Sequence, residues 1–145
     1  MIKTENEYTQ AKEKLDTEFK TIETHQAKMR KNGFTEEQVE LASDPLISFS
    51  LQLKEEIEEY ERLKRGDFND LTNFYGIGRL LIALRIFKGM KQGELAQKLG
   101  VAGPQVSRDE ANEYHGASVE KIQKILDALG VELKTTIENP YEKTA

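Results

Sequence analysis

The sequence predicts an all-α protein in which a helical extension precedes a small helical domain with a short C-terminal β-strand. Three observations lead to this prediction. Apolar residues recur at helical spacing through most of the 145 residues, and stop signals such as Asn32-Gly33 separate the periodic segments. Only residues 131–138 alternate apolar and polar side chains, as a strand does. Because the chain has no cysteine, disulfides and cysteine-based zinc sites are excluded.

Residues 1–70 are predicted to form the helical extension, which would serve in dimerisation or partner binding. One long helix is expected over residues 4–31, where apolar residues fall at steps of three, four and seven. Thr35 is a candidate N-cap for a short helix over 36–42. A further helix should begin at Asp44-Pro45, with Asp as its cap and Pro at its first helical position.

Residues 71–131 are predicted to form the helical domain, with a boundary to the extension near residues 67–72. An apolar helix is expected from Ile77 to about Gly89, followed by helices over 92–99, 103–112 and 118–129. Residues 132–145 would then contain the strand and a tail.

The segment from residue 92 to residue 110 has the pattern of two helices crossing at a steep angle through a short turn. Ala96 is a small residue at the expected crossing point, and Gly100 suits a turn residue with positive φ. Apolar side chains are expected to fill the wedge between the two helices. These side chains are Leu95, Leu99, Val101 and Val106.

This pattern belongs to a longer set of residues spread between positions 77 and 131. The set consists of Arg85, Gly89, Gln92, Glu94-Leu95-Ala96, Leu99-Gly100-Val101, Val106-Ser107-Arg108, Glu110, Ile122, Ile125 and Ala128-Leu129-Gly130. With these residues the segment resembles the XRE, or phage-repressor (Cro-like), helix-turn-helix family, whose domain has four or five helices. Residues 1–70, through Glu7-Tyr8 and Ala11, resemble the helical extension of HigA-type antitoxin regulators.

The resemblance implies that the second helix of the pair lies in the major groove of double-stranded DNA. Gln105 and Arg108 are the leading candidates for base readout, because Gln pairs with adenine and Arg with guanine. Lys91 and Gln92 are expected to contact phosphate, which positions the protein without reading sequence. The full set of candidate DNA-binding residues is Lys91, Gln92, Gly103, Pro104, Gln105, Ser107, Arg108, Asn112 and Tyr114.

Two departures from the family pattern bear on specificity. Gly103-Pro104 replaces the usual polar pair at the tip of the second helix, so two base-reading side chains are missing. Asp109 stands where relatives carry an apolar residue. Either the helix is rotated, or Asp109 pairs locally, for example with a basic side chain of the preceding helix. Arg108 has an alternative role as an ion-pair partner of Glu94 or Glu110.

The charge distribution is compatible with DNA although the whole chain has a net charge of −5. Residues 1–70 sum to −6 and residues 71–145 to +1, and the stretch from Arg79 to Arg108 has a local charge of +5. Screening limits distant charges to about 8–10 Å at ordinary salt, so a local basic cluster can meet phosphate.

The sequence therefore predicts a homodimeric, sequence-specific transcription regulator, acting as a repressor and not as an enzyme. No cofactor or metal is expected, and Ser107 has no base placed to activate it. Two alternatives stay open: the antitoxin of a HigA-type pair, which also binds a protein toxin, and an interaction module that has lost DNA binding.

The expected location is the cytoplasm, with no membrane partner. The N-terminus lacks the pattern of a secretory signal, and the longest apolar stretch, Leu80 to Leu84, is too short to span a bilayer. The predicted dimer contact is the C-terminal strand, whose unpaired edge would accept the same strand of a second copy. Residues 1–70 are the alternative contact.

Overall fold

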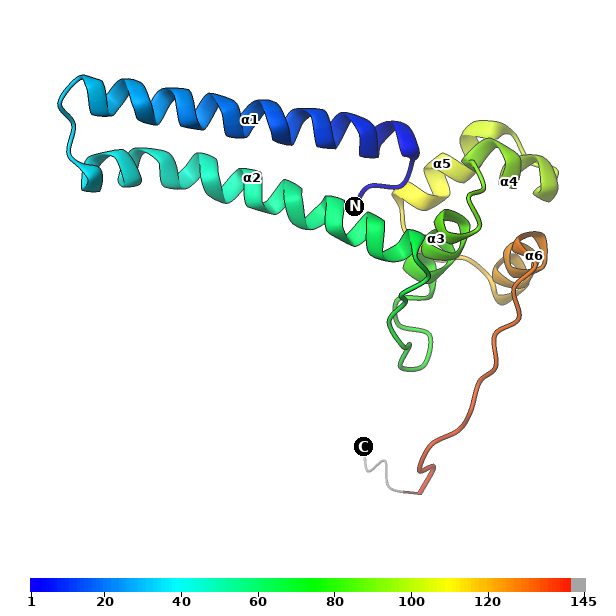
Figure 1. Ribbon diagram of the computed structural model, residues 1–145. Helices are drawn as coiled ribbons and strands as arrows, with labels where there is room; N and C mark the ends of the chain where they lie inside the picture. Colours follow the sequence, from blue (N-terminus) through cyan, green and yellow to red (C-terminus); the bar gives the residue numbers. More distant parts are fainter. Residues whose placement is uncertain (142–145) are drawn as a thin grey trace.

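The computed structural model describes residues 1–141, and over these residues the chain forms six α-helices and no β-strand. The first two helices form a long antiparallel hairpin, and the other four gather at one end of it (Figure 1). The predicted all-α class is confirmed. None of the helices in this range combines the length and apolar character needed to cross a membrane. The helices are α1 (Glu5–Lys31), α2 (Glu36–Lys64), α3 (Ile77–Phe87), α4 (Gln92–Leu99), α5 (Gly103–Ala111) and α6 (Val119–Leu129).

Both helices of the hairpin begin with a capping box. The Thr4 hydroxyl accepts a hydrogen bond from the Glu7 backbone N–H, and the Glu7 carboxylate accepts one from the backbone N–H of Thr4. Thr35 and Gln38 repeat the same exchange at the start of α2. Each box satisfies two of the N–H groups that a helix N-terminus leaves without an intrahelical partner.

The predicted helix break at Asp44-Pro45 is wrong, because α2 runs without interruption from residue 36 to residue 64 with Pro45 inside it. Proline has no N–H, so one intrahelical hydrogen bond is lost there. Packing against α1 offsets this loss, since Val39, Ser43 and Ser50 on either side of the proline are all buried. The extension therefore contains two helices instead of the three that the sequence predicted.

The near end of the hairpin, next to the other helices, is joined by two stacked tyrosines. The rings of Tyr8 and Tyr60 have their centroids 5.0 Å apart. The Tyr60 hydroxyl donates a hydrogen bond to the Glu5 carboxylate over 3.0 Å, and the Tyr8 hydroxyl donates to Glu61 over 2.6 Å. Burial, followed by the hydrogen bond to Glu5 and the Glu5 charge, raises the pKa of Tyr60 to about 12. These contacts fix the register of α1 on α2.

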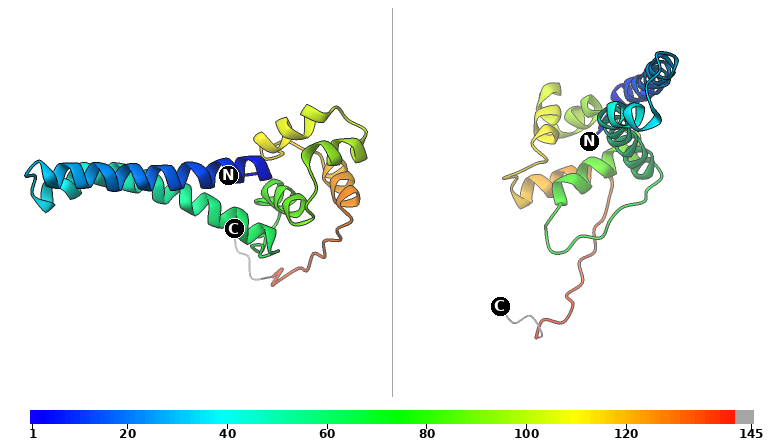
Figure 2. Two further views of the ribbon diagram at one scale, coloured as in Figure 1. Left: turned by 45° about the horizontal axis from the view of Figure 1, so that its top comes forward. Right: turned by 90° about the vertical axis from the view of Figure 1, so that its left-hand side faces the viewer.

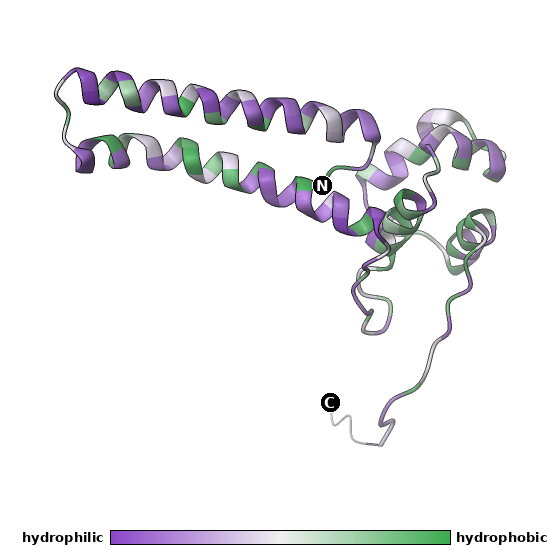
Figure 3. Cartoon of the chain, in the orientation of Figure 1, coloured by the Kyte–Doolittle hydropathy of each residue, from purple (hydrophilic) through white to green (hydrophobic). Residues whose placement is uncertain are grey.

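Helices α3 to α6 enclose a core that is continuous with the near end of the hairpin. Leu81 and Ile82 of α3, Leu95 of α4 and Ile125 of α6 are at most 1% exposed. Leu63 of α2 belongs to the same apolar cluster. Apolar residues are concentrated in α3 and in α6, whereas the two long helices are mostly polar (Figure 3). The far part of the hairpin projects away from this core (Figure 2).

The predicted C-terminal strand is wrong for the single chain. After α6, residues 131–139 are irregular, and the segment runs away from the helices (Figure 1). Within the described range, the backbone of this segment forms one hydrogen bond, from the Val131 N–H to the Leu126 carbonyl. A strand needs a neighbouring strand, and the helical domain supplies none. Part of the predicted tail, residues 142–145, lies outside the described residues.

Candidate nucleic-acid interface

Helices α4 and α5 form the steeply crossing pair that the sequence predicted. Gly100 ends α4 with φ of 68°, in the left-handed region that glycine adopts without strain. Ala96 is 1% exposed at the crossing, and Leu95 and Val106 are equally buried beneath it. Val101 is 43% exposed, so its predicted place in the wedge is wrong.

A buried ion pair holds α5 against α3. The Arg85 guanidinium of α3 donates two parallel hydrogen bonds to the Glu110 carboxylate of α5, one of them, from Nη2, over 2.8 Å. The Arg85 side chain is 3% exposed and that of Glu110 is fully buried. Arg85 also donates to the carbonyl oxygens of Met90 and Lys3, over 2.9 and 2.8 Å. The same guanidinium therefore connects α3 and α5 with the residues that precede α1.

Gln92, the first residue of α4, adds a third helix to this hydrogen-bond network. Its Nε2 donates a hydrogen bond to the Glu110 carboxylate over 2.6 Å, and the side chain is half-buried.

The buried Arg85–Glu110 ion pair also changes the surface charge that the sequence indicated. Arg85 contributes no surface charge because it is buried with Glu110. The exposed cations between positions 79 and 108 are Arg79, Lys88, Lys91, Lys98 and Arg108.

The exposed part of α5 lies at its N-terminus and along one side. Gly103, Pro104, Ser107 and Arg108 are all exposed. Lys91, the N-cap residue of α4, is exposed as well, and its backbone N–H donates to the Glu94 carboxylate over 2.6 Å. These positions give the pair of helices an outer surface with cationic side chains on both helices.

Asp109 forms its ion pair with the helix after α5, which corrects the predicted pairing with the preceding helix. Its Oδ2 lies 2.8 Å from the Lys121 ammonium of α6, and its Oδ1 accepts a hydrogen bond from Gln105 Nε2 over 3.0 Å. Gln105 Oε1 in turn accepts a hydrogen bond from Arg108 Nη2 over 3.1 Å. Arg108 is therefore linked to α6 and not to Glu94 or Glu110. The sequence analysis missed Lys121, because nothing in its local pattern distinguishes it from other helix-face lysines.

The last two candidates lie after α5, and only one is on the surface. Asn112, the C-cap residue, is exposed, and its Nδ2 donates to the His115 carbonyl over 3.4 Å. Tyr114 is 7% exposed and belongs to the core cluster, so the prediction that it contacts DNA is wrong. The backbone turn at Glu113 and Tyr114, with φ of 50° and 55°, directs this ring inward. Burial raises the pKa of the Tyr114 hydroxyl.

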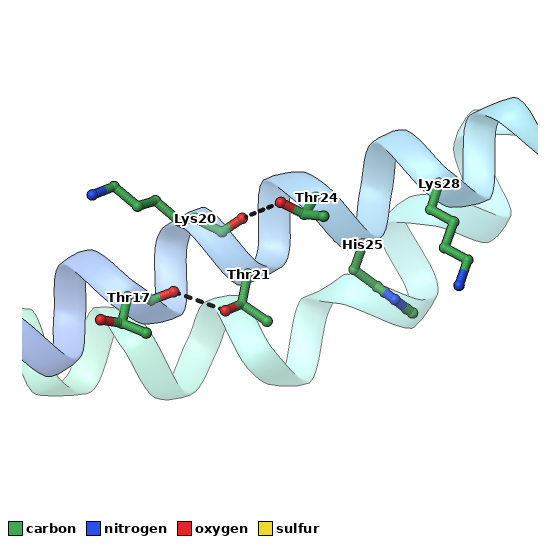
Figure 4. Close-up of a pocket in the computed structure, with 6 residues that line it drawn as sticks. All are labelled: Thr17, Lys20, Thr21, Thr24, His25 and Lys28. Atoms are coloured by element: carbon green, nitrogen blue, oxygen red, sulfur yellow. Dashed lines mark hydrogen bonds between the residues drawn. The ribbon is translucent and has the colours of Figure 1, made fainter.

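A shallow hollow of about 420 Å³ lies along the surface of α1 between residues 17 and 28 (Figure 4). All of its lining residues come from this one helix. The hydroxyls of Thr17, Thr21 and Thr24 each donate to a backbone carbonyl one turn earlier, over 2.9 Å. With these groups used locally and no second element facing them, the hollow does not resemble a built ligand site.

Comparison with protein families identifies the part of the chain that contains α4 and α5. Residues 81–135 match the family model described as Helix-turn-helix. This part of the chain is a helix-turn-helix domain of the XRE type. No match was found among curated proteins or among solved structures.

The match extends from the middle of α3 through α6 into the extended C-terminal segment. It agrees with the resemblance on which the sequence analysis relied, and it leaves the hairpin of α1 and α2 outside the matched residues. A helix-turn-helix domain of this type indicates a DNA-binding transcription regulator. Within it, α5 occupies the position of the recognition helix, the second helix of the pair.

Proposed function

We propose that this protein is a sequence-specific, double-stranded DNA-binding transcription regulator that acts as a repressor. The observation that supports the proposal most directly is the exposed side of α5, where Arg108 lies on the surface of a helix-turn-helix domain. The buried Arg85–Glu110 pair holds α5 rigidly on α3. A recognition helix needs such rigidity, because base contacts tolerate little displacement.

DNA binding should weaken steeply as salt rises, because lysine and arginine release counterions when they neutralise phosphates. With about three phosphate contacts, we expect the affinity for mixed-sequence duplex DNA to fall by at least about tenfold when the salt concentration is raised fourfold. Fluorescence anisotropy of labelled DNA at two salt concentrations measures this directly. If no binding is detected at the lower concentration, the proposal fails and an interaction module without DNA binding becomes the better description.

Substitutions of two exposed cations, Arg108 and Lys91, should distinguish base readout from phosphate contact. On the preferred site, which a selection from genomic DNA would define, Arg108→Ala should cost about 1–3 kcal/mol and relax the preference at one base position. Lys91→Ala should weaken all sequences about equally, because phosphate carries no base information. Unchanged affinity and unchanged preference in Arg108→Ala would show that α5 does not read DNA through this residue.

The proposed regulator is a homodimer in which the segment after α6 takes part. One helix-turn-helix domain reads few base pairs, and two copies on half-sites about one helical turn apart give useful affinity. Leu133 and Ile137 in this segment are 40% and 83% exposed, and the backbone groups beside them have no strand to pair with among residues 1–141. Pairing with the same segment of a second copy would bury the apolar side chains and satisfy the backbone.

Light scattering on the full chain and on a version that ends at Gly130 tests this arrangement. We expect a dimer for the full chain and a monomer for the shortened one. A dimer that survives the truncation unchanged would place the interface in residues 1–70. A monomeric full chain would overturn both placements.

A second candidate function, the antitoxin of a toxin–antitoxin pair, is favoured by the surface of the hairpin. Four apolar side chains of α2 are 46–74% exposed, namely Leu41, Leu46, Phe49 and Leu51. Asp44 is the only charged residue between positions 41 and 53. A protein toxin would cover such side chains. Co-expression with a neighbouring gene for a small basic protein, followed by co-purification, decides the point. A Phe49→Glu variant should lose such a partner while keeping its affinity for DNA.

A further inference from the structure

We infer that Lys121, Asp109 and Gln105 form a relay that positions the Arg108 guanidinium and thereby sets its base preference. The inference rests on the proposed function, since it assigns the specificity of the same DNA-binding surface. Arg108 is the residue that would touch the base. The other three are positioning residues that act through one another.

The relay runs from α6 to the exposed side of α5 in three steps. The Lys121 ammonium lies 2.8 Å from Asp109 Oδ2, Gln105 Nε2 lies 3.0 Å from Asp109 Oδ1, and Gln105 Oε1 lies 3.1 Å from Arg108 Nη2. The side chain of Asp109 is 19% exposed and that of Lys121 is 41% exposed. The ion pair is thus partly shielded from water at its carboxylate end, where electrostatic contacts are strongest.

The carboxylate determines which way the Gln105 amide faces. An ionised Asp109 only accepts hydrogen bonds, so it selects the NH₂ group of Gln105 and turns the carbonyl oxygen toward Arg108. The guanidinium only donates, so this oxygen is a suitable partner for it. Because both ends of the amide are engaged, Gln105 is not free to pair bidentately with adenine. The sequence predicted both Gln105 and Arg108 as base-reading residues, whereas the structure gives Gln105 a positioning role and leaves Arg108 for base contact.

The relay also explains how a charged residue is accommodated at position 109 on the half-buried side of α5. A half-buried carboxylate without partners would be costly. Here both of its oxygens have partners. Gly103 and Pro104 bring no polar side chain to the tip of α5. Base preference therefore depends more strongly on the orientation of Arg108. Long side chains lose conformational entropy on binding, and a guanidinium already held by a neighbour loses less.

The first experiment compares two lysines of α6. Lys121→Met removes the cation that anchors Asp109, and Lys124→Met, a matched control on the same helix, removes an exposed cation outside the relay. Losing a good guanine contact reduces discrimination by about five- to 150-fold. We expect Lys121→Met to lower the preference for the favoured base at the Arg108 position by at least about fivefold, and Lys124→Met to leave that preference unchanged.

The second experiment separates positioning from stability by reversing the ion pair. Asp109→Lys combined with Lys121→Asp keeps one positive and one negative side chain, so the melting temperature should stay close to that of the native chain. The lysine at position 109 attracts the carbonyl oxygen of Gln105 and turns its NH₂ group toward Arg108. The Gln105 NH₂ group and the Arg108 guanidinium, both donors, then face each other. The double variant should therefore be as stable as the native chain and yet lack its base preference.

The outcomes distinguish this inference from the proposed function. The relay is overturned if the native chain discriminates between bases and the reversed pair discriminates equally well. It is also overturned if Lys121→Met and Lys124→Met weaken all sequences alike. Absence of DNA binding by the native chain would instead overturn the proposed function. In that case NMR of the free protein still tests the geometry. The Gln105 side-chain amide signal should shift in Lys121→Met and not in Lys124→Met. An unchanged signal in Lys121→Met, or an equal shift in both variants, rejects the relay.

Discussion

Replacing Gly78 with alanine is expected to destabilise the protein by about 3 kcal/mol or more, because the new methyl group would overlap a backbone segment. Gly78 is buried in the first turn of α3, directly against the turn between α5 and α6. A Cβ at this position would collide with the Glu113 carbonyl oxygen and lie 2.7 Å from its carbon. The obstacle is main chain, so rotation of a flexible side chain cannot relieve the overlap.

The turn that Gly78 contacts has little freedom to move away. Glu113 and Tyr114 both adopt positive φ, and their backbone N–H groups donate to the carbonyls of Glu110 and Asp109. The Tyr114 ring is anchored in the core. Relief of the overlap would therefore have to separate α3 from the end of α5.

Urea denaturation followed by circular dichroism measures the effect, with Gly93→Ala as the matched control. Gly93 is also helical, and a Cβ there meets nothing within 4 Å. The control should be neutral or more stable by up to about 1 kcal/mol, since alanine favours helix more than glycine does. Equal stability of Gly78→Ala and the native chain would contradict the close approach of α3 to this turn.

Replacing Arg85 with methionine should cost about 3–5 kcal/mol, the usual loss when one partner of a buried ion pair is removed. The Glu110 carboxylate would stay buried and would keep only the Gln92 amide as a partner. The carbonyls of Lys3 and Met90 would lose a donor at the same time.

Two further variants identify the cause of this loss. Arg79→Met, a control in the same helix, removes an arginine whose side chain is 58% exposed and whose carboxylate partner is 3.7 Å away. It should change the free energy of unfolding by less than about 1 kcal/mol. Adding Glu110→Met to Arg85→Met should recover much of the stability, because no buried charge is then left alone. A double variant no more stable than Arg85→Met would show that the loss has another origin.

The sequence alone was sufficient for the elements whose signals are local. Helix α4 occupies residues 92–99 as predicted, and Gly100 ends it with positive φ, because a glycine after an amphipathic segment is a strong stop signal. The class of the C-terminal domain followed from a set of spaced residues that together suit two crossing helices. The start of α1 was predicted within one residue from the apolar spacing, and Thr35 was correctly predicted as the N-cap that begins α2.

The errors arose where a distant contact outweighs a local signal. Asp44-Pro45 looks like a helix start, yet burial of Val39 and Ser50 against α1 carries α2 through it. The alternation of residues 131–137 is typical of a strand, yet a strand forms only beside a partner strand, and the described part of the single chain offers none. The free energy of a local conformational preference is small compared with that of packing a whole helix or sheet.

What the sequence determined by itself is therefore the set of helices in the C-terminal domain and the position of the turn between α4 and α5. Only the tertiary structure decided which polar side chains are partners. Arg85 and Glu110 are 25 positions apart, and Asp109 and Lys121 are 12 positions apart on different helices. Whether such residues meet depends on how the helices cross and rotate against one another. Periodicity along the chain does not encode that geometry, because it places apolar side chains in the core without assigning partners to the charged ones.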